Sequence, residues 1–360
     1  MNTLSPLRFL LFALGAATAS GQTVSTDPVG FIPVTAKGNS DTIISTPLHR
    51  AADFRGTVAS LSGDTLTINS ATFVIDAFNG SHYVLIASGD REGMWYAVTD
   101  TTATTLKVDL AGDDLTGHVA NGTEIEVIPF WTLNTVFPEG SGVHASPTFR
   151  PGSRVLIPDA GTAGIKLASS ASYFYYSGTA SGGEGWRKFG AVPSQKFDDQ
   201  ILIPDTHFII RHEVPTDTLV TNLGSVQMTS LATVIGTLQA GQAQDNTIAF
   251  NVAVPTSLLD SGLFGSGVFA GSSDIDVPAD LLLVFDNSVA GKNKTPSAIY
   301  FYYTGTGNGG AGWRKQGDPA TTIHNATQAF QPANGYVLRK AATTPAQAAI
   351  WQTRPGYVPQ

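Results

Sequence analysis

One aromatic pattern, which occurs twice in the chain, is the strongest candidate for a binding site. Residues 173–190 and 300–317 align without a gap, and 13 of their 18 positions are identical. Each copy reads Tyr-Phe-Tyr-Tyr, then a glycine-rich stretch, then Gly-Trp-Arg-Lys. Alternate residues of a strand face the same way, so two tyrosines of each copy share a face, and a tryptophan follows one strand later. The six candidate ligand-binding residues are Tyr173, Tyr175, Trp186, Tyr300, Tyr302 and Trp313.

Two interpretations of these rings stay open. In the first, they form a flat aromatic platform for sugar rings or another extended polymer. In the second, they fill the protein core and pair across neighbouring strands. The second interpretation is favoured, because aromatic side chains mostly contribute burial energy.

Basic residues and glycines accompany both aromatic copies. Arg187-Lys188 and Arg314-Lys315 follow the tryptophans. We expect a solvated strand face there, with a cation–π contact to a neighbouring ring. The glycine-rich stretches 178–185 and 305–312 lack the Gly-Lys-Ser/Thr ending of a phosphate-binding loop and lie between two strands. They predict hairpin loops.

Nothing in the sequence selects catalytic or metal-binding residues. The chain has no cysteine and no Gly-x-Ser-x-Gly motif for a nucleophile. Acidic pairs such as Asp113-Asp114 fit turns better than a calcium loop, and the seven histidines form no zinc motif. Glycoside hydrolysis needs two carboxylates at a set distance in the folded protein. Sequence spacing does not reveal that distance, so no pair can be named. We therefore predict no catalytic residue, metal or cofactor, and a non-enzymatic protein is favoured over an enzyme.

The composition predicts an all-β protein. Hydrophobic residues make up 42% of the 360 positions and charged residues only 13%, while Gly (38) and Pro (20) are abundant. Low charge with many β-branched and turn residues favours strands over helices. The formal net charge is -8 and no run of Lys or Arg occurs, which disfavours nucleic acid as a partner.

The first 21 residues predict a signal peptide. Arg8 supplies a positive charge, residues 9–17 are apolar, and small residues follow for cleavage. No stretch is long and apolar enough for a transmembrane helix. We expect an exported protein in the periplasm, at the cell surface or secreted. Without cysteine it forms no disulfide and depends on the size of its core.

The spacing of the repeats predicts two homologous β-sandwich-like units. The aromatic segments lie 127 residues apart, whereas an earlier match of Thr42 with Thr247 lies at an offset of 205. The difference of 78 residues indicates an insertion into the first unit. We expect a first unit at 22–50 plus 131–215, an insert at 51–130, a second unit at 221–345 and a tail at 346–360.

The insert predicts a small antiparallel β-barrel. Six short alternating runs, separated by turn residues, suit a sheet that closes on itself. They are residues 55–61, 65–69, 83–87, 94–99, 106–110 and 124–130. Farther along the chain, residues 216–224 predict a linker between the units, and residues 345–351 predict a short helix.

Several stretches resemble a paralogous family of exported proteins from Verrucomicrobia. They are Thr26-Asp27-Pro28-Val29-Gly30-Phe31, Asp41-Thr42, Arg91-Glu92-Gly93-Met94, Asp109-Leu110-Ala111-Gly112-Asp113-Asp114-Leu115 and Ile128-Pro129-Phe130-Trp131-Thr132-Leu133. The resemblance covers most of the chain after the signal peptide, up to about Val220. It implies export and a repeated β organisation, and it carries no assigned activity.

Together these observations favour an exported structural or interaction protein. Framework residues are duplicated, and no catalytic constellation is duplicated with them. A carbohydrate-binding module that uses the aromatic strands is the alternative, and a secreted hydrolase is less favoured. An extracellular polysaccharide or another surface protein is the expected partner.

Overall fold

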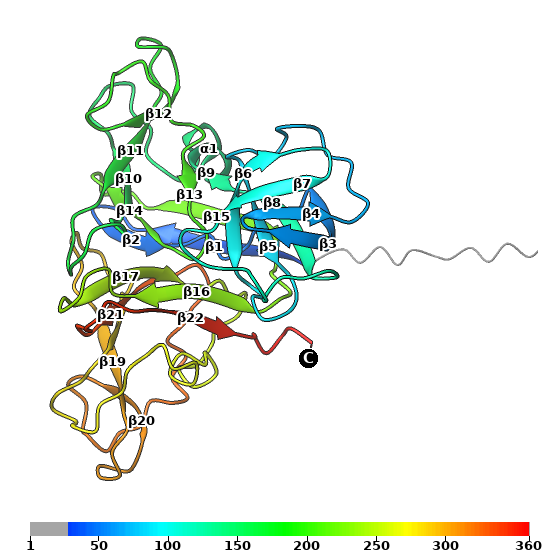
Figure 1. Ribbon diagram of the computed structural model, residues 1–360. Coiled ribbons are helices and arrows are strands. Elements are labelled where there is room, and N and C mark those ends of the chain that lie inside the picture. Colours follow the sequence, from blue (N-terminus) through cyan, green and yellow to red (C-terminus); the bar gives the residue numbers. More distant parts are fainter. Residues whose placement is uncertain (1–27, 360) are drawn as a thin grey trace, which may run out of the picture.

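The computed structural model describes residues 28–359, and these residues are almost entirely β-structure. The prediction of an all-β protein is confirmed (Figure 1). The only helices in this range are α1 (Leu133–Val136) and the 3-10 helix η1 (Pro138–Gly140). The predicted signal peptide lies outside the described residues. Within them, no helix is long and apolar enough to cross a membrane.

The predicted barrel is present as a closed six-stranded antiparallel sheet. Its core lies inside the barrel, where alternate residues such as Val58, Val84 and Val98 are fully buried. The strand order is β3-β4-β7-β6-β5-β8. The strands are β3 (Phe54–Ser62), β4 (Thr65–Ile68), β5 (His82–Ile86), β6 (Trp95–Thr101), β7 (Thr105–Asp109) and β8 (Glu124–Pro129).

The first unit surrounds the barrel in the sequence and consists of two layers. A five-stranded antiparallel sheet, β12-β11-β10-β14-β2, is covered by the two-stranded first ribbon, β1-β15. A small pair, β9-β13, lies beside them. The strands are β1 (Val29–Ala36), β2 (Asp41–Ile44), β9 (Trp131–Thr132), β10 (Ser153–Ile157), β11 (Ala171–Tyr176), β12 (Gly185–Lys188), β13 (Ile201–Leu202), β14 (Phe208–His212) and β15 (Thr218–Ser225).

The second unit repeats this arrangement. Its sheet has the order β20-β19-β18-β21-β17, and its second ribbon is β16-β22. Figure 1 shows β11 and β12 at one end of the molecule and β19 and β20 at the other. The strands are β16 (Leu231–Gly236), β17 (Gln244–Ala249), β18 (Leu281–Val284), β19 (Ala298–Tyr303), β20 (Gly312–Lys315), β21 (Gly335–Lys340) and β22 (Ala348–Thr353).

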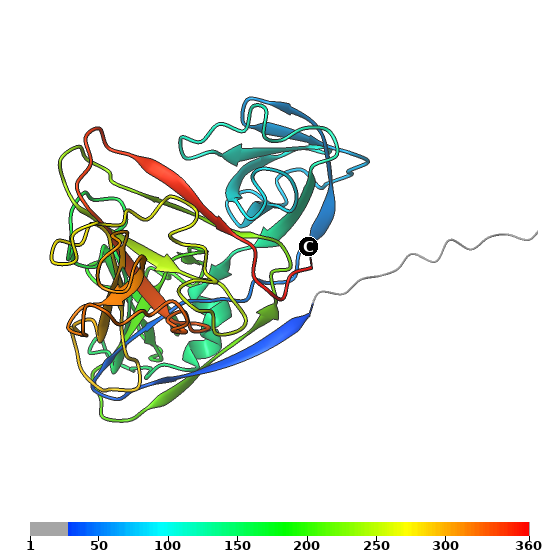
Figure 2. The same ribbon diagram turned by 90° about the horizontal axis from the view of Figure 1, so that it is seen from below.

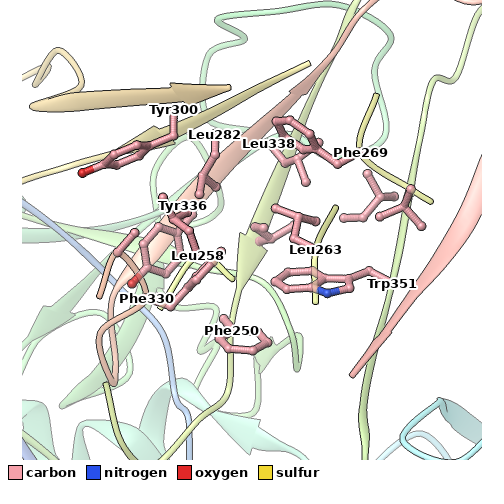
Figure 3. Close-up of a cluster of buried hydrophobic side chains, with 14 of the residues drawn as sticks. Phe250, Leu258, Leu263, Phe269, Leu282, Tyr300, Phe330, Tyr336, Leu338 and Trp351 are labelled. Carbon is pink, nitrogen blue, oxygen red and sulfur yellow. The ribbon is translucent and has the colours of Figure 1, made fainter. Parts of the chain in front are cut away.

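Each unit has its own core between the sheet and the ribbon. In the second unit Trp351 of the ribbon stacks on Phe250, with ring centroids 4.8 Å apart, and the side chains of the sheet complete the cluster (Figure 3). In the first unit Ala36 and Val220 of the ribbon pack against the aromatic side chains of the sheet. The two layers bury apolar faces that neither could cover alone.

The contacts between the units are reciprocal. Ser45 donates a backbone hydrogen bond to Ala333 (2.9 Å), and at the equivalent place Ala249 donates one to Asp205 (2.7 Å). Asp41 likewise bonds Gly291 while Asp245 bonds Gly164, both at 2.9 Å. A contact in which each partner uses the same patch is the pattern of a two-fold-symmetric dimer. The two units therefore pack side by side as a pseudo-symmetric pair.

The alignment of β2 with β17 differs by one residue from the sequence prediction. Arg211 binds Asp41 through two hydrogen bonds of 2.6 and 2.7 Å, and Arg339 binds Asp245 in the same way. Asp41 is thus equivalent to Asp245, at an offset of 204, and the predicted match of Thr42 with Thr247 is wrong. Shifting the alignment by one residue moves every side chain to the opposite face of the strand. The equivalent arginine–aspartate pairs therefore decide which alignment is correct.

Two further predictions at the ends of the units are wrong. Residues 216–224 are not a linker, because Thr218–Ser225 forms β15 and pairs with β1 over eight residues. Residues 345–351 are not a helix, and 346–360 is not a separate tail. Ala348–Thr353 forms β22, which pairs with β16 and buries Trp351. Tertiary pairing overrides the helix propensity of this alanine-rich stretch.

Candidate functional site

The six predicted ligand-binding residues lie in the interiors of the two units. Trp186 and Trp313 are 0% and 1% exposed, and the tyrosines are buried except for the half-buried Tyr302, which stacks on Phe264. The exposed aromatic platform is therefore contradicted. Tyr175 pairs with Trp186 across β11 and β12 at 5.8 Å, edge to face. Such cross-strand pairs stabilise a core and leave no ring face for a ligand.

The arginines after the tryptophans are also buried, so the predicted solvated face is wrong. Arg187 is 1% exposed and donates hydrogen bonds to the carbonyl groups of Ser181, Gly183, Trp186 and Pro193. These bonds satisfy a guanidinium group that would otherwise be costly to bury. They tie the glycine-rich hairpin loop to the sheet.

The second unit repeats this arginine network residue by residue. Arg314 is 2% exposed and binds the carbonyl groups of Asn308, Gly310, Trp313 and Ala320. The predicted cation–π contacts are present: Arg187 lies 5.5 Å from the ring centroid of Tyr176, and Arg314 lies 5.4 Å from that of Tyr303. Both arginines therefore hold loops in place rather than bind an anion.

A serine–histidine pair lies in the first unit, and the sequence did not reveal it. Ser153 of β10 and His212 of β14 are opposite each other, with Oγ and Nδ1 2.7 Å apart. Thr218 Oγ1 donates its proton to Gly142 O, so it accepts from the Nε2–H of His212. In the neutral ring Nδ1 then accepts from the Ser153 hydroxyl, whose oxygen also accepts from the His144 N–H.

This pair is structural rather than nucleophilic. Ser153 is 2% exposed and His212 is fully buried, so no substrate reaches them. Burial, with a contribution from the neighbouring His144, lowers the pKa of His212 to about 4. The imidazole is neutral at physiological pH and completes a hydrogen-bond chain between strands. Only the register of two distant strands brings the residues together, which is why no local motif signals them.

Metal-binding side chains do not converge in the described part of the chain. Across residues 28–359, no three His, Asp or Glu side chains come close enough to hold an ion. Asp113 instead accepts hydrogen bonds from Arg91 and Tyr96, and Asp198 accepts one from the Trp186 N–H.

A small cavity of about 40 Å³ lies where the barrel and both units meet. Asp205 reaches into it and accepts hydrogen bonds from the Trp95 indole and the Thr233 hydroxyl. Burial raises the pKa of Asp205 to about 7, and the two hydrogen bonds lower it only in part. This volume is far below the several hundred Å³ of ordinary ligand sites. Asp205 therefore links the three parts of the molecule and does not line a substrate pocket.

The outer face of the first ribbon is an apolar surface that the fold leaves uncovered. Four large side chains on one face of β1 and β15 are more than half exposed: Val29 (71%), Phe31 (62%), Leu219 (58%) and Leu223 (57%). Figure 2 shows the two strands running together along the lower edge of the molecule, away from the barrel. Clustered exposed apolar residues on a soluble protein mark interaction sites more often than single ones do.

A groove of about 400 Å³ adjoins this face. One wall is β15 from Leu219 to Leu223, and the other includes Trp131 of β9, Val136 of α1 and Pro138 of η1. Helix α1 starts there because Thr132 caps it: its hydroxyl accepts from the Thr135 N–H. The groove volume lies in the range of ordinary ligand sites, and its mouth opens beside the exposed apolar residues.

The equivalent face of the second ribbon is covered by the barrel at the end near Ala232, whereas Val234 on the same face is 52% exposed. Ala232 of β16 belongs to the barrel's core, and Ile350 of β22 packs against it. Glu92 of the barrel accepts hydrogen bonds from the Ser230 N–H and from Arg354. Gly93 approaches so closely that a Cβ atom there would lie 2.3 Å from the Ser230 carbonyl oxygen.

Comparison with known proteins adds no relative. No family model, no curated protein and no solved structure matches this chain.

Proposed function

We propose that this chain is an exported, non-enzymatic interaction protein that binds its partner through the outer face of the first ribbon and the adjoining groove. One observation carries the proposal. Part of the outer face of the second ribbon is a docking surface for the barrel and one large apolar residue there, Val234, is more than half exposed, whereas the same face of the first ribbon is apolar and more than half exposed at four positions.

We further propose that the two units arose by duplication of one ancestral β unit. The barrel then entered the first copy between β2 and β9. Identical strand order, the two equivalent arginine networks and the reciprocal contacts between the units support this history. The resemblance to exported proteins of Verrucomicrobia and the signal-like first 21 residues support export.

Burial of the chemically active groups favours binding over catalysis. The serine–histidine pair and the aromatic rings are enclosed, and the central cavity is too small for a substrate. A glycan-binding role would need a surface other than the six predicted rings. Binding through the first ribbon needs no rearrangement, because its apolar side chains already face solvent.

A cross-linking experiment in the native host tests this proposal. A photoreactive amino acid at position 31 of the full exported chain is expected to form a cross-linked species. The same amino acid at position 74, where Val74 is 76% exposed on the barrel insert, is expected to form none. Absence of cross-linking at position 31, or equal cross-linking at both positions, contradicts the proposal. Turnover of glycans, esters or peptides by the purified mature chain contradicts its non-enzymatic part.

A further inference from the structure

We propose that the groove beside β15 accepts an extended segment of another polypeptide, which pairs with β15 as an additional antiparallel or parallel strand. This inference rests on the proposed function, because it names the kind of partner for the same surface. It adds a binding mode in which backbone hydrogen bonds supply affinity and side chains supply specificity.

Backbone groups of β15 are available along the groove. Ser225 exchanges two backbone hydrogen bonds with His49 on the side away from β1 (2.8 and 3.1 Å). In an antiparallel ladder every second residue points the same way, so Leu219, Thr221 and Leu223 also point away from β1. Within residues 28–359 these three residues make no backbone hydrogen bond on that side, and Gly142 covers the carbonyl oxygen of Leu219, so the freely available groups are those of Thr221 and Leu223.

The other edge of the ribbon is unsuited to strand addition. On β1, Pro33 lies opposite Thr221, and proline has no N–H to donate. A proline on an exposed edge blocks pairing with an incoming strand. The opposite edge, on β15, carries no such block, and it is the edge along which the groove runs.

The ends of the groove limit the length of the incoming segment. His49 occupies the edge at Ser225, and Gly142 lies against Leu219, where a Cβ would come within 3.2 Å of the Leu219 carbonyl oxygen. The unpaired stretch therefore spans about five residues, or roughly 15 Å of extended chain. A peptide of five to seven residues fits this edge.

The chemistry of the groove favours an uncharged, apolar segment. Its walls combine Trp131, Val136, Pro138, Leu219 and Leu223, and no charged side chain of the described residues lines it. A buried charge without a partner would be costly there. The backbone of an incoming strand would pair with the unpaired N–H and C=O groups of β15. Apolar residues at alternate positions of that strand would contact the apolar walls.

The experiment first selects peptides that bind the chain and then blocks the backbone edge of β15 by mutation. Ten-residue random peptides displayed on phage are selected on the immobilised mature chain, and an enriched peptide is synthesised for affinity measurements. We expect alternating apolar sequences. We expect Thr221→Pro to weaken binding about tenfold or more, because the proline removes an outward N–H and obstructs the edge. Thr35→Pro is the matched control on β1, and we expect less than about a twofold change.

A second measurement uses the unaltered chain, so it does not depend on folding of the proline variant. The enriched peptide is N-methylated at each position in turn. Methylation at alternate positions is expected to abolish binding, because only those N–H groups face β15. Tolerance of methylation everywhere, or equal affinity for the Thr221→Pro and Thr35→Pro variants, overturns strand addition.

Other outcomes separate this inference from the proposed function. Failure to enrich any peptide overturns strand addition but leaves the cross-linking test at position 31 to decide the proposed function. Binding lost in Phe31→Lys but kept in Thr221→Pro means that the face binds the partner without strand pairing. A chain that is dimeric alone and becomes monomeric with Thr221→Pro overturns the assigned partner, because a second copy then fills the groove.

Discussion

The two ribbons have the same fold and opposite surroundings. The barrel covers one end of the second ribbon, with Ala232 and Ile350 packed against the barrel's core, and leaves Val234 exposed. The first ribbon leaves Phe31 and Leu219 exposed. In both, the inner face packs on its own sheet, through Val220 in one case and Trp351 in the other. The outer face is therefore not needed to hold a unit together, and one copy has used it to bind another domain.

The position of the barrel sharpens this contrast. It leaves the first unit after β2 and returns at β9, yet it docks on the ribbon of the second unit. Asp205 of the first unit closes the junction by accepting hydrogen bonds from the barrel and from β16. Its counterpart in the second unit is Ala333, which has no carboxylate and faces no barrel. Of the two equivalent positions, only the one occupied by Asp205 thus contacts the barrel.

The largest effect is expected where the two units are most alike. Arg187→Met and Arg314→Met each remove a buried guanidinium group and leave carbonyl groups of a loop without donors. We expect each to lower the free energy of unfolding by about 3 kcal/mol or more. Urea denaturation measures the change, with the less buried Lys188→Met as control. A large loss in one unit and none in the other would show that the two networks are not equivalent.

The next effect tests how the barrel docks on the second ribbon. Gly93 has φ +91° and has no room for a Cβ beside Ser230. Gly63 has φ +58° but nothing within 4 Å, so Gly63→Ala measures the backbone cost alone. We expect Gly93→Ala to cost about 2 kcal/mol more than Gly63→Ala and to expose the barrel junction to limited proteolysis. Equal costs would mean that docking is not close at this point.

The pH dependence of the junction is expected to be smaller. The pKa of Asp205 is raised to about 7 by burial, whereas the unfolded chain titrates near 3.8. The folded state thus keeps a proton between about pH 4 and pH 7 that the unfolded state has lost. Stability from this group is present below pH 4 and falls as the pH rises to 7.

Asp205→Asn isolates this contribution from other titrating groups. The pKa values of buried His207 and His212 are lowered to about 4, so these residues destabilise the fold as the pH falls and oppose the trend of Asp205. The asparagine keeps an acceptor for Trp95 and Thr233. We expect its advantage over the unaltered chain to grow by roughly 1–3 kcal/mol between pH 4 and pH 8. A constant difference in melting temperature would argue against an ionisable junction.

The sequence predicted the architecture better than the site. Repeated aromatic strands identify the sheets, and six alternating runs identify the barrel, because both depend on local patterns. The burial of Arg187 could not be predicted, since its partners are main-chain carbonyls that leave no side-chain signature. The alignment of β2 with β17 failed because neighbouring threonines gave a better local match than the paired Asp41 and Asp245.

The candidate surface could not be found from local patterns for a different reason. Leu219, Thr221 and Leu223 form a short alternating stretch inside residues 216–224, and the sequence predicts a linker for this range. Which face is covered depends on where the barrel docks, and that contact joins residues more than 130 positions apart, such as Glu92 and Ser230. Exposure of the first ribbon is thus a property of the assembled molecule.

The smallest expected effect is the one that compares the two ribbons directly. Leu219 and Ile350 both lie on the outer faces of their ribbons, one residue before the buried Val220 and Trp351. Ile350→Ser removes a side chain that packs on the barrel, and we expect a loss of about 1–2 kcal/mol. Leu219→Ser removes a side chain that is 58% exposed, and we expect a change within about 0.5 kcal/mol. Urea denaturation of both variants measures the difference. A Leu219→Ser variant as unstable as Ile350→Ser would mean that the first ribbon needs its outer side chains for folding, and its apolar face would then require no partner.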